Sequence, residues 1–340
     1  QWRAVLRQGI CGGGSCARIA ASEGHVHRIV KKSHKAFAKG LMGLAVLGAV
    51  IYIANPVQLW GRLQQANPWW LLAGFGASIA SNIVSVWRWR AMAYWLGAEM
   101  SFAAGMRWYF QAIGLNVLLP GAVVGGDVYR AVALQRTGQP KAASNLSVIL
   151  DRISGLWMLC AIGGLGAAAC APVLAPWLKL NPLHLSTLVL GLTALWLLLP
   201  VALLLGLRNG WLKALGSWLD PVRQAASSPH YLQELLLQFF ASALVQVLSA
   251  AALAFGGIAL GAVLAPQVWA FAIAPVFLMA ALPVSVGGWG TREAAAVAAL
   301  APFGVPVDLA VGVGLLYGVY ALGQGALGAL ALGLPSRNQA

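Results

Sequence analysis

Long runs of apolar residues recur along the chain and are separated by short polar segments. A helix that crosses a bilayer needs about 20 mostly apolar residues. The runs that reach this length lie at about 40–60, 68–90, 144–170, 183–206, 235–260 and 306–333. The pattern predicts an all-α polytopic membrane protein with about six spanning helices.

Two further apolar stretches, about 103–137 and 267–301, are interrupted halfway by proline and glycine. The first contains the sequence LPGAVVGGDVYR, and the second contains LPVSVGGWGTR. Both run from Leu-Pro to Gly-Gly, and an arginine, Arg130 or Arg292, stands four positions after the second glycine. Unwound backbone is tolerated inside a bilayer only where protein or a polar cavity surrounds it. The two stretches therefore predict re-entrant hairpins built from broken helices.

The broken stretches also predict an internal repeat, with repeat 1 at about 40–170 and repeat 2 at about 183–333. Each repeat would hold three spanning helices and one hairpin, so that an odd number of crossings inverts the second repeat. The hairpins would then enter from opposite faces and meet near the midplane, as in transporters with inverted repeats. Chance recurrence of glycine and proline in a Gly-rich chain is the alternative. The transmembrane domain would cover 37–335, with tails at 1–36 and 336–340.

Composition excludes the ordinary soluble classes. Residues of the set AVILMFWYC make up 60% of the 340 residues and charged residues only 9%, against about 25% charged residues in soluble proteins. The net charge of +14 would suggest nucleic acid as the partner of a soluble domain. In a membrane protein, however, basic residues accumulate on the cytoplasmic flanks of the helices. We therefore expect no nucleic-acid partner, and a basic tail at 1–36 that is attracted to anionic lipid.

The loop charges orient the helices. With the N-terminal tail in the cytoplasm, nearly every loop cation falls on the cytoplasmic side, and Arg62 and Lys179 are the exceptions. The C-terminus then also lies in the cytoplasm, and the expected location is the inner, cytoplasmic membrane of the cell. The sequence Trp-Arg-Trp-Arg at 87–90 is typical of a belt at the membrane interface.

The two Gly-Gly breaks are candidate substrate-binding sites. Each is expected to begin a short helix, at 125–127 and at 288–290, whose first N–H groups lack partners and whose dipole attracts anions. Arg130 and Arg292 follow about one turn later and add a planar donor fork suited to phosphate. The alternative is that both arginines snorkel to an interface. The other residues assigned to these sites are Gly125, Gly126 and Asp127 in the first, and Gly287, Gly288, Gly290 and Glu293 in the second.

The pair Asp151-Arg152 lies within the apolar run 144–170 and completes the predicted substrate site. Charges are costly in hydrocarbon, and neighbours in sequence point about 100° apart around a helix, so these two cannot satisfy each other well. We expect Asp151 to pair with one of the two arginines of the breaks, and Arg152 to pair with Asp127 or Glu293. The alternative places both near the cytoplasmic end of the helix, within reach of water.

Together these motifs resemble the transmembrane region of the lysylphosphatidylglycerol synthases, a family that is also described as flippase-like. The resemblance covers about 40–335, and two departures accompany it: the family usually has Glu-Arg where this chain has Asp151-Arg152, and Gly-Glu or Gly-Asp variants precede the first arginine. In true synthases an aminoacyltransferase domain follows the membrane region, so the resemblance implies the lipid-moving half and not the synthase reaction. The motifs are Arg88-Trp89-Arg90, the break at 119–130, Asp151-Arg152 and the break at 282–293.

The leading functional hypothesis is a transporter that moves an anionic phospholipid or a lipid-linked glycan between leaflets. The second is a non-transporting scaffold or accessory subunit of a lipid-modifying enzyme. A membrane-embedded lipid transferase is a weaker third hypothesis, because no catalytic constellation accompanies the motifs. We expect no enzymatic activity, no metal and no cofactor. A homo-oligomer is left open.

Overall fold

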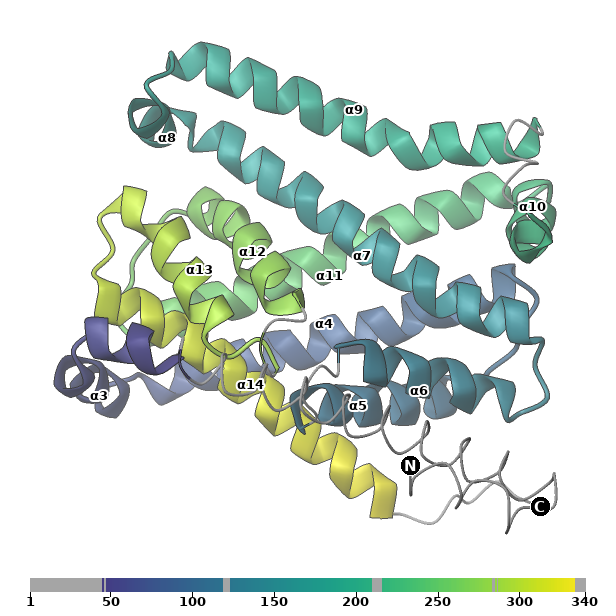
Figure 1. Cartoon of the computed structure of the whole chain (residues 1–340), viewed down its shortest axis with the longest axis horizontal. Coiled ribbons are helices and arrows are strands. Elements are labelled where there is room, and N and C mark those ends of the chain that lie inside the picture. The colour runs from purple at the N-terminus through teal and green to yellow at the C-terminus, as the bar shows by residue number, and fades with distance from the viewer. Residues whose placement is uncertain are drawn as a thin grey trace, which may run out of the picture.

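The computed structural model describes residues 45, 47–118, 123–209, 216–282, 285 and 287–333. Helices and their connections make up this part of the chain, which contains no β-strand, and they form one bundle (Figure 1). The elements are α3 (Pro56–Gln64), α4 (Pro68–Trp95), α5 (Phe102–Leu118), α6 (Val123–Gln135), α7 (Lys141–Ala169), α8 (Ala171–Leu178), α9 (Pro182–Arg208), η2 (Ser217–Leu219), α10 (Asp220–Ala226), α11 (Tyr231–Ala259), α12 (Pro266–Ala281), α13 (Thr291–Leu300), η3 (Ala301–Phe303) and α14 (Val307–Gly333).

Helices α4, α7, α9, α11 and α14 are long and apolar enough to cross a bilayer. They confirm the predicted runs that begin at 68, 144, 183, 235 and 306, to within five residues at each end. The chain is therefore a polytopic membrane protein.

The predicted run 40–60 is only partly described, since 40–44 lies outside the described residues. The prediction of one continuous helix as far as 60 is wrong. The helix ends before Asn55, which adopts a left-handed φ of 58°. The Asn55 side chain then accepts a hydrogen bond from the Val57 N–H, and α3 begins at Pro56. An asparagine cap followed by proline starts a new helix instead of prolonging the old one.

Each predicted hairpin is a pair of short helices in contact, α5 with α6 and α12 with α13. These helices have 17, 13, 16 and 10 residues, which corresponds to lengths of about 15–26 Å. All are shorter than the hydrocarbon core of about 30 Å. Pro120 and Pro283, which led to the prediction of the two breaks, lie outside the described residues. The prediction of two broken-helix hairpins is confirmed.

The two hairpins open at opposite ends of the bundle (Figure 1). At the open end of the first, the Glu99 N–H donates to Gln139 Oε1 at 2.9 Å, which joins the segment before α5 to the segment after α6. At the open end of the second, the rings of Phe271 and Phe303 pack with centroids 6.0 Å apart. This is the opposed entry that an inverted repeat requires.

Packing between the halves is reciprocal. Helix α5 of the first hairpin packs on α14, and α12 of the second hairpin packs on α7, while α4 and α11 pack extensively on each other. Each hairpin therefore leans on the last long helix of the other half. Such an exchange is what a two-fold relation in the membrane plane produces. The bounds of the repeats and of the tails remain predictions.

A stripe of small polar residues on α4 explains its close contact with α11. Ser78, Ser81 and Ser85 are buried on one face of α4, and the Ser81 hydroxyl forms a hydrogen bond with Ser249 of α11 at 2.8 Å. Small side chains let helix backbones approach, and hydroxyl groups bond across the interface. Arg88, three residues after Ser85, is buried on the same face of α4.

Helix α9 lies at the edge of the bundle and packs mainly on α7 (Figure 1). Pro200 inside α9 has no N–H to donate to the carbonyl four residues earlier. That carbonyl, of Trp196, instead accepts a hydrogen bond from Trp157 Nε1 of α7 at 2.8 Å. In return, Trp196 Nε1 donates to the Trp157 carbonyl at 2.9 Å. Two reciprocal hydrogen bonds therefore attach α9 to α7.

Candidate functional site: a charge network at the first hairpin

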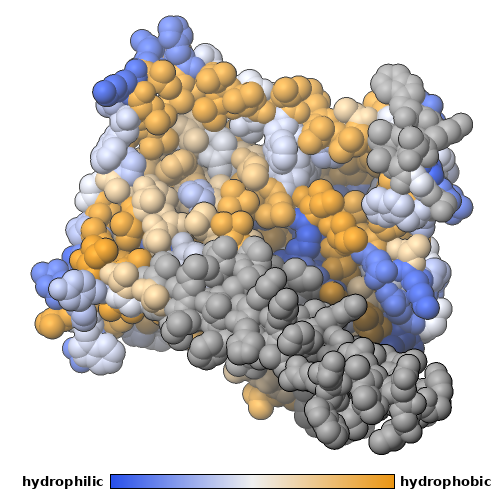
Figure 2. Space-filling model, viewed as in Figure 1, coloured by the Kyte–Doolittle hydropathy of each residue, from blue (hydrophilic) through white to orange (hydrophobic). Residues whose placement is uncertain are grey.

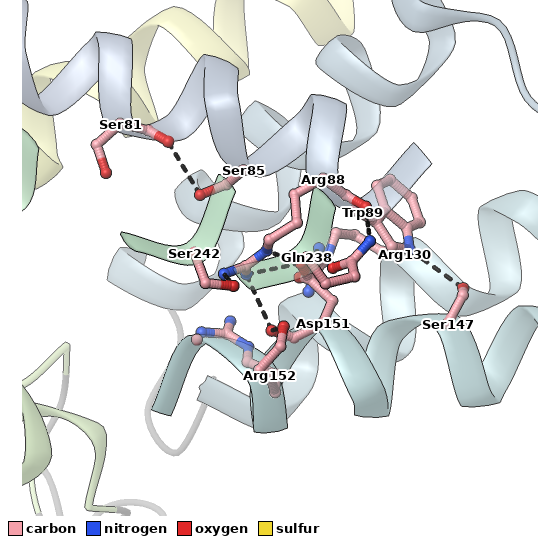
Figure 3. Close-up of polar contacts among 12 residues, drawn as sticks. Ser81, Ser85, Arg88, Trp89, Arg130, Ser147, Asp151, Arg152, Gln238 and Ser242 are labelled. Atoms are coloured by element: carbon pink, nitrogen blue, oxygen red, sulfur yellow. Dashed lines mark hydrogen bonds and ion pairs between the residues drawn. The ribbon is translucent and has the colours of Figure 1, made fainter. Parts of the chain in front are cut away.

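Asp151 on α7 is the centre of the site and is 1% exposed. Arg88 on α4 donates to Asp151 Oδ1 from Nη2 at 2.7 Å and from Nε at 3.1 Å. Arg130 on α6 donates from Nη1 to Asp151 Oδ2 at 3.0 Å. One carboxylate therefore joins three helices through both of its oxygens, as the converging side chains in Figure 3 show. A buried carboxylate needs such charge-assisted partners.

Arg130 is enclosed by aromatic rings. Its guanidinium carbon lies 4.9 Å from the ring centroid of Trp89 and 4.6 Å from that of Tyr109, so the cation stacks between two faces that favour positive charge. The Trp89 ring is fixed in turn by a 3.1 Å hydrogen bond from its Nε1 to Ser147. A second guanidinium nitrogen, Nη2, donates to Asp127 at 2.9 Å. Arg130 therefore pairs with two carboxylates, and its side chain is 2% exposed.

Arg88 is equally well satisfied. Besides the two bonds to the Asp151 carboxylate, Nη2 donates to the Asp151 carbonyl at 2.9 Å, and Nη1 donates to the Ser242 hydroxyl on α11 at 3.0 Å. The Arg88 carbonyl accepts a 3.3 Å hydrogen bond from Gln238. The buried part of the network is therefore built from four helices and holds its charges in fixed positions.

The network reaches the surface through Asp127 and Arg152. Arg152 Nε lies 2.9 and 2.8 Å from the two carboxylate oxygens of Asp127. The Asp127 side chain is 20% exposed and that of Arg152 is 44% exposed. In Figure 2 a hydrophilic area interrupts the otherwise hydrophobic surface beside the middle of α7. A continuous series of ion pairs therefore connects the buried Arg88 to the exposed Arg152.

The first predicted helix start is displaced. Helix α6 begins at Val123, so the range 125–127 lies within its first turns and not at its start. The Gly126 N–H donates to Asn116 Oδ1 of α5 at 2.9 Å. A Cβ at position 126 would lie 2.5 Å from the Ala112 carbonyl oxygen, so glycine is needed for this close approach. Gly125 is exposed. Asn116 thus occupies the donor that was assigned to an anion.

At the second hairpin the predicted helix start is confirmed, and a carboxylate of the chain itself occupies it. Gly290, with φ 85°, precedes the first residue of α13, and its N–H donates to Glu293 Oε2 at 2.6 Å. Arg292 Nη2 donates to Glu293 Oε1 at 2.7 Å, and its guanidinium stacks 4.8 Å from the Trp289 ring centroid. Gly287 and Gly288 form the turn before these residues.

The predicted site residues therefore form two networks. Asp151 pairs with Arg130 and not with Arg292, and Arg152 pairs with Asp127 and not with Glu293. In the part of the chain that the structure describes, no hydrogen bond or ion pair joins the two networks. Within the same residues, no three His, Cys, Asp or Glu side chains gather to hold a metal ion.

Arg88 is the residue that the sequence-based assignment of the site missed. The sequence Trp-Arg-Trp-Arg was interpreted as an interfacial belt, and this is wrong for Arg88 and Trp89, which are 3% and 0% exposed. Trp87 does lie on the surface. A signal was available, because Ser81, Ser85 and Arg88 follow one another at intervals of four and three residues. That spacing places them on one face of a helix.

A comparison with protein families agrees with this architecture. The family model described as "Lysylphosphatidylglycerol synthase TM region" matches residues 40–328. The chain therefore belongs to the lysylphosphatidylglycerol synthase transmembrane-region family, and the predicted resemblance is confirmed. A comparison with curated proteins finds no match.

Proposed function

We propose that this protein moves an anionic phospholipid or a lipid-linked glycan between the leaflets of a membrane. One observation carries the proposal: a chain of ion pairs that runs from the buried Asp151 to the exposed Arg152 and joins α7 to the broken-helix hairpin through Arg130 and Asp127. Ionisable groups inside a membrane are costly, and where they persist they mark pathways for charged substrates.

The surrounding architecture supports transport over anchoring. Two hairpins that open at opposite ends of the bundle, each leaning on the other half, allow one half to rock against the other around a central site. This is the arrangement through which secondary transporters alternate their access. Membership of the family suggests a flippase-like protein, and the charge network is where a lipid headgroup would bind.

We further propose an orientation in the inner, cytoplasmic membrane. Loop and helix-end cations gather at one end of the bundle, where α5 begins and where α6 and α9 end; they are Arg90, Arg107, Arg136, Lys141, Arg208 and Arg223. The opposite end has Arg62 and Lys179. By the positive-inside rule the basic end faces the cytoplasm, and this would place both termini there.

Transport without covalent chemistry is also part of the proposal. The carboxylates of both networks are paired with arginines. An acid or base for catalysis would need hydrogen-bond reach to a reacting group, whereas Asp151 and Glu293 have their oxygens occupied by fixed donors.

The test is leaflet exchange of a fluorescent anionic lipid in vesicles that contain the purified protein. We expect exchange with the wild type and a loss of roughly one to two decades in Arg130→Ala vesicles, because Arg130 links Asp127 to Asp151 and a charge-assisted contact contributes about 1.5–3 kcal/mol. Full activity in a folded Arg130→Ala variant would exclude the proposed site. No exchange by a well-folded wild type would overturn the proposal and favour the scaffold hypothesis.

A further inference from the structure

The charge network contains one arginine whose terminal nitrogens are available. Arg152 uses its Nε to contact Asp127, and among the described residues no acceptor contacts its Nη1 or Nη2. Arg130 differs because both of its Nη groups are bound to carboxylates. A guanidinium presents its donors as a planar fork that fits the oxygens of a phosphate. Nη1 and Nη2 of Arg152 therefore stay available to donate hydrogen bonds to a ligand.

Arg152 also faces lipid. It lies on α7 between Ile149 and Leu156, three residues before and four residues after it, and both of these side chains are exposed. Side chains at such intervals share a helix face. On the neighbouring helix α6, Val128 is 55% exposed. Apolar side chains exposed on a spanning helix contact acyl chains, so the guanidinium stands in a lipid-facing surface.

The position along α7 places this guanidinium within the bilayer. Arg152 is 11 residues after Lys141, the first residue of the helix, which corresponds to about 16 Å along the helix axis. The hydrocarbon core is about 30 Å thick. The bonds from Nε to Asp127, 2.8 and 2.9 Å long, hold the side chain against α6 and oppose its snorkelling to the interface.

The ion-paired residues of the charge network do not neutralise one another completely. Arg88, Arg130 and Arg152 contribute +3, and Asp127 and Asp151 contribute −2, so the network has a net charge of +1. In a medium of low dielectric constant an uncompensated charge is expensive. A ligand with one negative charge neutralises the network, whereas a zwitterion leaves +1 and a dianion leaves −1.

We propose that Arg152 is the residue that recognises the lipid headgroup, and that the single net positive charge of the network selects headgroups with one negative charge. A phosphodiester without a compensating amine is the chemistry that fits: its free oxygens meet the Nη1 and Nη2 donors while its acyl chains lie against the exposed side chains of α6 and α7. This inference rests on the proposed function, because it names the class of lipid that the site would take.

The test measures binding and exchange with three lipids. Phosphatidylglycerol carries one negative charge and phosphatidylcholine none, and phosphatidic acid is a phosphate monoester that carries nearly two. We expect phosphatidylglycerol to raise the unfolding temperature of the purified protein more than the other two lipids, and to exchange between leaflets about ten times faster. Arg152→Gln should lower phosphatidylglycerol exchange by roughly tenfold, to the level of phosphatidylcholine. Arg152→Lys should restore it only partly, because an ammonium lacks the fork.

The matched control is Arg208→Gln, which removes one positive charge far from the network. Arg208 stacks on Tyr231 at the basic end, with its guanidinium carbon 5.2 Å from the ring centroid. This variant should keep the wild-type order of lipids. In the opposite direction, Asp127→Asn raises the net charge of the network to +2 and should shift the preference toward phosphatidic acid.

The outcomes separate the two proposals. A wild type that binds and exchanges all three lipids equally, or an Arg152→Gln variant that keeps the preference for phosphatidylglycerol, overturns the inference and leaves transport standing. A wild type that is selectively stabilised by phosphatidylglycerol but exchanges no lipid supports the recognition and overturns transport. If Asp127→Asn does not fold, the lipid preferences of Arg152→Gln and Arg208→Gln still show whether Arg152 recognises the headgroup.

Discussion

The two hairpins carry similar sequences, yet their charges are arranged differently. At the first, Arg130 reaches across to a carboxylate on another helix, and the network extends to a lipid-facing arginine. At the second, Arg292 pairs with its own neighbour, Glu293, and both are at least 96% buried. The first network has a net charge of +1 and an exposed edge. The second is neutral and closed.

The packing of α14 explains why the second cluster is closed. A Cβ at Gly314 would lie 3.0 Å from Glu293 Cα, and a Cβ at Gly318 would overlap with Arg292 Nη2. Two glycines on α14 therefore make room for the pair, which is buried against a helix backbone. The comparison suggests that one copy of the motif serves recognition while the other joins its hairpin to α14.

The largest effect is expected from Asp151→Asn. Removing this carboxylate charge leaves Arg88 and Arg130 buried without a counter-ion, so we expect a loss of about 3–5 kcal/mol in unfolding free energy together with loss of lipid exchange. Thermal or denaturant unfolding of purified protein measures the first. Asp220→Asn is the control, because Asp220 is half exposed and pairs with Arg223 at the surface, where ion pairs contribute at most about 1 kcal/mol. Equal effects of the two substitutions would contradict the central role of Asp151.

The second prediction separates a closed pair from an open network. Arg292→Ala leaves Glu293 buried and unpaired, at a cost of about 3 kcal/mol. Adding Glu293→Gln removes that charge and should restore most of the stability. The corresponding double variant at the first hairpin, Arg130→Ala with Asp151→Asn, should not recover, because Arg88 still lacks a counter-ion. Unfolding midpoints of Arg292→Ala, of Arg130→Ala and of the two double variants test this. Recovery in both pairs would show that the first network is also a self-contained pair.

The sequence allowed most of the fold to be predicted, because the signals are long and physical. Apolar runs located the spanning helices, and the Pro and Gly breaks located both hairpins with their opposed entry. The need to neutralise a charge in hydrocarbon narrowed the partners of Asp151 and of Arg152 to two candidates each, and one candidate of each pair, Arg130 and Asp127, is the partner observed. These features depend on composition over many residues or on a strong energetic penalty.

What escaped prediction depends on tertiary contact. Arg88 stands between two tryptophans, as a belt residue would, and only its packing against α7 and α11 buries it. Asn116 occupies the N–H of Gly126 through a contact between two helices. The self-pairing of Arg292 and Glu293 depends on rotamers at adjacent positions. Sequence spacing alone does not determine such contacts.

The smallest effect is expected from Gly318→Ala, which tests the closed cluster from the α14 side. The new methyl group would lie 2.8 Å from Trp289 Cη2 and would overlap with the Arg292 guanidinium. Overpacking of this kind costs about 1–3 kcal/mol, and the free energy of unfolding measures it. Gly191→Ala on α9 is the matched control, since nothing lies within 4 Å of its Cβ position; alanine there should be neutral or slightly stabilising. If the second hairpin is held rigidly to α14, Gly318→Ala should also slow lipid exchange without altering the preference among headgroups. A changed headgroup preference would place ligand contacts at the second hairpin and would remove the distinction between the two clusters.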